Sequence, residues 1–208
     1  MNQATTLVIP TLPERAELLK RALRSASFQE LDYDAIVIQP AGPTDDAAHT
    51  RQNGLNQVKT PWVTFLDDDD ELEPEHLLSL RTTQAEFGSD IVYSWFTVYE
   101  NDQPVPDDSR QLWLNGKSAF GRPWSREHYD ALQAGTWCFH LTALFRTEML
   151  QDVGGFEAPG RGKHDTYLSE DLNIEQRLAR GGATVTHCPR RTWRWHFWIG
   201  RTKGQPAP

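Results

Sequence analysis

Apolar residues in the first half of the chain follow two alternating patterns. Short runs rich in β-branched and aromatic residues predict buried strands at residues 6–9, 35–38, 62–66 and 91–96. Between them, apolar residues spaced three and four positions apart predict helices at residues 14–25, 46–57 and 74–87. Asp45 or Asp46 can cap the second of these helices. Strands separated by single helices favour right-handed crossovers, so this half predicts a mostly parallel α/β sheet.

The second half of the chain is less regular. Residues 101–135 carry several prolines, glycines and aromatics, which is typical of a functional or flexible loop region. The pattern then predicts a strand near residues 142–145, a short helix to Val153, a helix over residues 169–180 capped by Ser169, and a last strand at residues 183–187. We expect one domain over residues 1–208, with a change of organisation near residue 97.

Composition and charge narrow the classes of function. The chain has 208 residues, of which 38% are hydrophobic and 24% charged, as in a globular domain. Its net charge of −8 argues against a nucleic-acid partner, because polyanions are held by basic surfaces. Cys138 and Cys188 form no CxxC pattern, so we interpret them as thiols in or near the core.

The sequence contains no pattern that predicts a membrane span or a particular oligomeric state. No apolar run approaches the roughly 18 residues of a membrane span, and the first residues lack the apolar stretch of a signal peptide. We therefore expect no membrane span and a soluble, cytoplasmic protein. The sequence leaves the oligomeric state open, including a homo-oligomer.

Four consecutive carboxylates, Asp67 to Asp70, directly follow the strand predicted at residues 62–66. Ligands of parallel α/β sheets bind at the carboxyl ends of strands. Carboxylates this close repel one another, and Mn²⁺ or Mg²⁺, which prefer oxygen ligands, would offset that repulsion. An acidic loop can equally stabilise the start of the next helix through its dipole, so the run alone leaves both interpretations open.

Five segments, read in order, sharpen this picture: residues 6–23, 49–55, 60–77, 145–157 and 169–182. Together they resemble family 2 glycosyltransferases with the GT-A fold. The resemblance implies a mostly parallel, Rossmann-like α/β sheet flanked by helices. It also implies a nucleotide-sugar-binding half at residues 1–96 and an acceptor and catalytic-base half at residues 97–208.

The resemblance assigns donor-binding roles to a set of residues near the first three strands: Pro10, Thr11, Leu12, Glu14, Gln39, Arg51, Asp67 and Asp68. Leu12 stands where many members carry an aromatic residue that stacks on the base. Gln39 stands where the family often has an aspartate that reads the base, which leaves the nucleotide open among UDP, GDP and dTDP. A solvated helix charge is the alternative interpretation of Arg51.

By the same resemblance, Asp69 is a metal ligand, shared with Asp67 and completed by a late histidine at His196. The expected cofactor is Mn²⁺ or Mg²⁺, which would neutralise charge on the leaving diphosphate. We expect Arg191 and Arg194 to contact that diphosphate as well. A lone histidine among aromatic residues is more often packed than metal-bound, so this interpretation of His196 competes with a structural one.

Asp171 matches the family's general base, and Glu170 precedes it. The alternative is that both acids only favour a helix dipole. Gly155 and Phe156 lie in a turn that we expect to approach the sugar closely, because glycine removes the Cβ obstruction. Trp137 is assigned to the acceptor site, since sugar C–H faces pack on aromatic rings, whereas the other tryptophans, Trp195 included, are interpreted as packing residues.

The function implied is a metal-dependent inverting glycosyltransferase of the hexosyltransferase type, which makes a single addition from a nucleotide diphosphate sugar. The acceptor stays open among protein, glycan, lipid and small molecule. A sugar nucleotidyltransferase is one alternative, although residues 11–15 lack the glycine-rich loop that would cradle a triphosphate. A non-catalytic nucleotide- or glycan-binding module on a degenerate transferase fold is the other.

Overall fold

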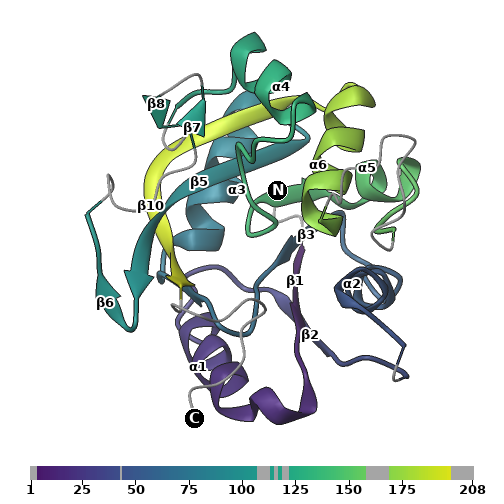
Figure 1. Cartoon of the computed structure of the whole chain (residues 1–208), viewed down its shortest axis with the longest axis vertical. Coiled ribbons are helices and arrows are strands. Elements are labelled where there is room, and N and C mark those ends of the chain that lie inside the picture. The colour runs from purple at the N-terminus through teal and green to yellow at the C-terminus, as the bar shows by residue number, and fades with distance from the viewer. Residues whose placement is uncertain are drawn as a thin grey trace.

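A computed structural model describes residues 4–42, 44–106, 122–157 and 169–197, and the backbone of residues 113–114 and 117–118. One curled sheet runs through the molecule and is flanked by helices (Figure 1). Its strand order is β2-β1-β3-β9-β5-β10-β4, with β6 paired to β5. The α/β class expected from the sequence is therefore confirmed.

The first half builds one end of this sheet by strand–helix alternation. Its elements are β1 (Thr5–Pro10), the short 3₁₀ helix η1 (Pro13–Arg15), α1 (Ala16–Ala26), β2 (Asp34–Ile38), α2 (Ala47–Leu55) and β3 (Trp62–Phe65). Strand β1 pairs in parallel with both β2 and β3. Asp46 caps α2, because its carboxylate accepts a hydrogen bond from the backbone N–H of His49 at 3.0 Å.

The rest of the chain, from β4 onward, adds parallel and antiparallel strands to the other end of the sheet. Its elements are β4 (Glu71–Leu72), α3 (His76–Phe87), β5 (Ile91–Glu100), β6 (Gln103–Pro104), β7 (Trp113–Leu114), β8 (Lys117–Ser118), α4 (Arg126–Gln133), β9 (Leu144–Arg146), α5 (Thr147–Asp152), α6 (Glu170–Arg180) and β10 (Val185–Phe197). Strands β5 and β10 are parallel, whereas β9 runs antiparallel to both β3 and β5. The sheet is thus not parallel throughout.

Three local expectations need correction. Strand β2 was expected to be buried, but it lies at the edge of the sheet and its side chains are half-buried or exposed. Ser169 stands at the start of α6, yet its side chain makes no capping hydrogen bond. Residues 101–135, expected to be irregular, contain helix α4, which Ser125 caps by accepting from the N–H of His128.

The last strand is much longer than expected. It continues past the predicted end at residue 187 as far as Phe197. The pairing with β5 shifts register between Cys188 and Arg191, around Pro189, which has no N–H to donate to the ladder. A bulge therefore carries the chain past the proline and brings Trp193 and Trp195 to the far end of the sheet.

One part of the core packs α2, α4, α5 and α6 against the central strands, and a second part packs α1 against β1, β5 and β10. Phe65 of β3 meets Phe145 of β9 edge-on at 6.5 Å, and both are fully buried. Burying one such side chain stabilises a fold by about 1.5–3 kcal/mol. This packing fixes β3 and β9 against each other. Because β9 runs antiparallel to β3, the segment that enters β9 lies where β3 ends.

Candidate active site

A cavity of about 210 Å³ opens where β3 ends. It is lined by residues of the acidic loop, α2, α6, the segment before β9, and β10. The lining residues are Arg51, Phe65, Asp67, Asp70, Trp137, His140, Leu141, Thr142, Asp171, Trp193 and Trp195. Segments that lie far apart in the sequence thus meet in one cavity.

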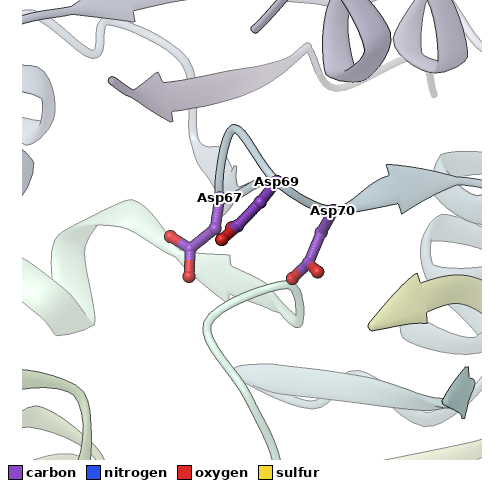
Figure 2. A group of neighbouring side chains, drawn as sticks. All are labelled: Asp67, Asp69 and Asp70. Carbon is purple, nitrogen blue, oxygen red and sulfur yellow. The ribbon is translucent and has the colours of Figure 1, made fainter. Parts of the chain in front are cut away.

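Three aspartates of the loop after β3 form a tight group. Asp67, Asp69 and Asp70 each offer an oxygen, and these oxygens lie within 4.8 Å of one another (Figure 2). The loop is folded by a turn in which the N–H of Asp70 donates to the carbonyl of Asp67 at 3.0 Å. Burial, and then the neighbouring carboxylates, raises the pKa of both Asp69 and Asp70. Oxygen ligands so arranged suit Mn²⁺ or Mg²⁺.

Asp70 was not expected among the metal ligands, although it belongs to the same acidic run. It is buried, and its carboxylate also accepts a hydrogen bond from the backbone N–H of His196 at 2.9 Å. That bond ties the acidic loop to β10. The turn from Asp67 to Asp70 places the Asp70 carboxylate beside those of Asp67 and Asp69. The residue pattern of this run does not predict that turn.

Asp68 faces the other side of the loop. Its side chain is 1% exposed, accepts a hydrogen bond from the Thr11 hydroxyl at 2.6 Å, and lies 2.9 Å from the Arg15 guanidinium. Burial raises the pKa of Asp68 to about 6, against the lowering effects of Thr11 and Arg15. Asp68 therefore fixes the loop to the start of α1. Arg15, which the sequence analysis missed, also reaches Asp69 at 2.7 Å.

Arg51 joins the two carboxylate-bearing elements of the cavity. Its guanidinium donates to Asp67 at 2.5 Å and to Glu170 at the start of α6. Burial alone lowers the pKa of Arg51, but the carboxylates of Asp67 and Glu170 outweigh it and raise that pKa. Arg51 is buried by this pairing, so it is not the solvated helix charge of the alternative interpretation.

Asp171, the residue expected to act as general base, lines the same cavity as Asp67 and Asp70. It is half-buried in the first turn of α6, next to Glu170. The arrangement on which the functional interpretation depends is therefore present in part: two of the three grouped aspartates, Asp67 and Asp70, line one cavity with the candidate base, whereas Asp69 does not line it.

His196, Arg191 and Arg194 do not line this cavity, so their roles toward the metal ion and the diphosphate stay predictions. His196 Nε2 lies 2.9 Å from Glu71 Oε1 and its ring stacks on Tyr99, so it is not part of the aspartate group. Arg194 binds Glu73 through two nitrogens at 2.7 and 3.2 Å. The reason is the alternation of β10: Trp193 and Trp195 face the cavity, so Arg194 and His196 face away.

Arg191 lies before the last register shift of β10 and donates to the carbonyl of Phe96 at 2.6 Å. Its guanidinium also lies over the ring of Trp95, 5.1 Å from the centroid. Both contacts anchor it on β5, outside the cavity. Arg51 of α2 and Arg15 of η1, by contrast, contact carboxylates of the loop, and Arg21 of α1 donates to the Asp69 carbonyl at 2.7 Å.

The glycine turn packs against the side chain of Gln52. Gly155 has φ +68°, and a Cβ there would lie 2.1 Å from Gln52 Oε1. The same amide oxygen accepts the N–H of Phe156 at 2.7 Å, and the Phe156 ring is buried against Phe65 at 5.1 Å. The glycine thus makes room for Gln52, and Phe156 supports the cavity wall from behind.

The candidate nucleotide residues lie at the ends of β1 and β2. A hydrogen bond of 2.9 Å from Thr11 N–H to the Ile38 carbonyl holds these strand ends together. Thr11 is buried, whereas Leu12 is 37% exposed. Glu14 and Gln39 are exposed and Pro10 is half-buried. None of these residues lines the cavity, so the structure places them beside it.

His140 is a cavity residue that the sequence analysis missed. Its ring packs against Phe96, Trp193 and Trp195, with centroids 5.1, 5.4 and 6.1 Å away. Burial lowers the pKa of His140, which Asp171 and Asp67 only partly oppose. Trp195, interpreted from sequence as a packing residue, also lines the cavity. No local pattern singles out His140, because only the turn into β9 brings it beside Asp171.

An acidic group at the carboxyl end of a central strand, facing a second carboxylate across a cavity in a mixed α/β sheet, defines the class of GT-A glycosyltransferases. The sequence profile described as glycosyl transferase family 2 matches residues 29–154, more than half of the chain. The chain belongs to that family. The matched region includes Arg51 and the acidic loop but ends before α6.

Solved structures of S. aureus TarS share the fold. The 1–349 segment of TarS superposes with a TM-score of 0.67 at 16% identity, over 93% of this chain and 60% of TarS 1–349. Its complex with UDP-GlcNAc gives 0.65 at 15% identity, over 95% and 60% of the two chains. The chain therefore spans less than two thirds of these neighbours. Among curated protein sequences, none matches the chain.

Within the described residues, every helix is too short or too polar to cross a bilayer.

Proposed function

We propose that this chain is a metal-dependent inverting glycosyltransferase that moves a sugar from a nucleotide diphosphate donor to an acceptor hydroxyl in a single addition. One observation carries the proposal: Asp67, Asp70 and Asp171 line a single cavity. We assign the whole chain to one domain, with residues 1–96 serving the donor and residues 97–208 serving the acceptor and the base.

Asp67, Asp69 and Asp70 would hold the Mn²⁺ or Mg²⁺ ion, since their oxygens already converge. When bound, the ion neutralises charge that grows on the diphosphate as the sugar–oxygen bond breaks. Arg15 holds Asp69 and Arg51 holds Asp67, which keeps two of the three carboxylates in place. Preorganised ligands of this kind need little rearrangement during the reaction.

Asp171 acts as general base in this proposal. It takes the proton of the acceptor hydroxyl while that oxygen bonds to the anomeric carbon of the donor. The bond from this carbon to the diphosphate breaks on the opposite side, and its electron pair leaves with the nucleotide. One in-line displacement inverts the anomeric centre. Arg51 orients Glu170, and through it the first turn of α6.

The nucleotide is expected at the ends of β1 and β2, near Thr11, Leu12 and Gln39. The fold likeness to TarS, which has been crystallised with UDP and with UDP-GlcNAc, makes uridine donors the first to test. Gln39 offers an amide to a base edge in place of the aspartate common in the family.

The proposal is tested by calorimetry with UDP, GDP and dTDP, and by a donor-hydrolysis screen across the corresponding sugars, each with and without Mn²⁺. We expect at least one nucleotide to bind, at least tenfold more tightly with Mn²⁺ than with EDTA. Asp69→Asn should remove this metal dependence, whereas the exposed Asp130→Asn on α4 serves as a matched control. Binding of none of the three nucleotides would favour the non-catalytic module instead.

A further inference from the structure

Aromatic residues form one wall of the cavity. Trp137 and His140 come from the segment before β9, and Trp193 and Trp195 come from the end of β10. Rings of this size present a broad apolar surface, and only a ligand with an apolar face can use it fully. The acidic loop, Arg51 and Asp171 provide the remaining polar lining.

The wall is held rigidly. The Leu141 carbonyl accepts a hydrogen bond from Phe65 N–H at 3.1 Å, and the Thr142 carbonyl accepts one from the Thr64 hydroxyl at 3.1 Å. The carbonyl of His140 itself accepts the Ala143 N–H at 2.9 Å. The backbone of residues 140–142 is thus fixed, with Leu141 and Thr142 bonded to β3.

Two polar atoms of this wall lack a protein partner. Trp137 Nε1 and His140 Nε2 are buried, and neither has a hydrogen-bond partner in the part of the chain that the structure describes. A buried polar atom without a hydrogen-bond partner destabilises the fold. A bound ligand with hydroxyl groups would satisfy both atoms, since the indole donates and a neutral imidazole can donate or accept.

The position of the wall assigns it to the acceptor. The nucleotide residues follow β1 and β2 at one end of the sheet, whereas the wall is built by β10 and the entry to β9 toward the other end. The charge of the cavity restricts the acceptor further. Three carboxylates line it, against the single guanidinium of Arg51, which is already paired twice. An anionic acceptor would be repelled by this lining.

We infer that the acceptor is a neutral pyranose ring, whose apolar face packs on Trp193 and Trp195 and whose hydroxyls bond to Trp137 Nε1 and His140 Nε2. This inference rests on the proposed function, because it names the substrate of the same site. His140 is then a binding residue that places the attacking hydroxyl beside Asp171.

The test is saturation-transfer NMR with methyl glycosides of glucose, galactose, mannose and N-acetylglucosamine, recorded with and without UDP and Mn²⁺. At least one pyranoside should bind, whereas ribitol and a Ser/Thr peptide should not, because they lack a rigid apolar ring face. Trp137→Phe and His140→Phe should each weaken pyranoside binding about three- to tenfold, the cost of one hydrogen bond. His140→Gln, which restores a polar atom near Nε2, should recover affinity to within about twofold.

Matched controls are Trp124→Phe and His49→Gln, whose side chains lie outside the cavity lining. Circular dichroism confirms that each variant is folded, and His140→Gln keeps the test valid if the phenylalanine variant is not. Binding of ribitol or the peptide instead, or unchanged pyranoside affinity in both phenylalanine variants, would overturn the inference. UDP binding in the same samples tests the proposed function separately, so the two failures are distinguishable.

Discussion

The acidic loop after β3 and the first turns of α6 both place carboxylates around the cavity, but they compensate the charge in different ways. In the loop, Arg15 reaches Asp68 and Asp69, and Arg51 reaches Asp67. In α6, Arg51 reaches Glu170, while Glu175, one turn beyond Asp171, is 0% exposed and neither of its oxygens has a partner among the described residues.

This difference in charge compensation means that the loop is suited to bind a metal ion, whereas Glu175 in α6 is suited to hold a proton. The loop gathers guanidinium groups around oxygens that converge, so a metal ion can complete the compensation. Glu175 has no such neighbour, and burial, followed by the charge of Asp171, raises its pKa well above the usual range. A proton therefore neutralises Glu175. Arg51 pairs with a carboxylate of each region, Asp67 in the loop and Glu170 in α6.

The largest effect should come from removing the base between these regions. Asp171→Asn keeps the shape but cannot take the acceptor proton, so transfer should fall by about 10²–10⁴-fold. Product formation under saturating donor measures it, with UDP binding as the check that the site is intact. Asp152→Asn, an exposed aspartate on α5, is the control. Transfer above one tenth of the wild-type rate would remove Asp171 from its role.

Breaking the shared contact should destabilise both regions. Arg51→Met leaves Asp67 and Glu170 without their buried partner, and loss of one member of a buried ion pair costs about 3–5 kcal/mol. Urea unfolding measures this free energy. Arg126→Met on α4 removes an arginine whose side chain is 81% exposed, so it should leave the free energy of unfolding nearly unchanged. Similar losses in both variants would mean that Arg51 does not join the regions.

The cation interpretation of the loop predicts opposite effects with and without metal. Asp70→Asn keeps the oxygen that accepts the His196 N–H but removes a buried charge, so the metal-free protein should be more stable. Mn²⁺ at a hundredfold excess over Kd should stabilise the wild type by about 2.7 kcal/mol and the variant by much less. Thermal unfolding with Mn²⁺ and with EDTA measures both. Equal Mn²⁺ shifts in the two proteins would contradict the metal site.

The proton interpretation of Glu175 predicts the smallest effect. Because the folded pKa lies above the unfolded value of about 4.3, the unfolded chain loses this proton first as pH rises. Above pH 4.3, stability should fall by about 1.4 kcal/mol per pH unit from this group, up to its folded pKa. Glu175→Gln should flatten the profile by that amount between unfolding at pH 5 and unfolding at pH 6. A wild-type profile that the substitution leaves unchanged would show that Glu175 is already ionised.

Local pattern was enough for much of the fold and for part of the site. The predicted strands and helices are all present, and Asp46 caps α2 as its position suggested. The acidic run and the acids that open α6 were found because each follows or begins a regular element. That the two acidic segments lie in one cavity could be predicted only from the resemblance over five segments in order, because spacing along the chain does not give distance in space.

The missed residues depend on burial and pairing, which no local pattern reports. Arg15, His140 and Glu175 look like ordinary polar residues until the fold buries them. Pro189 looked like the end of a strand, and this hid the alternation that turns Trp193 toward the cavity and His196 away from it. Gly155 was explained by a ligand, although its neighbour is the side chain of Gln52.

The two ion pairs of Arg51 have a consequence for the order in which substrates bind. Its two carboxylate partners lie on the donor loop and on the helix that carries the base, so whatever draws Asp67 toward a cation leaves Arg51 to Glu170 alone. Donor and metal binding at the loop would then change the contact of Arg51 with α6 before the acceptor binds. Under the proposed function, this coupling predicts an ordered reaction in which the nucleotide sugar binds first and the nucleotide leaves last.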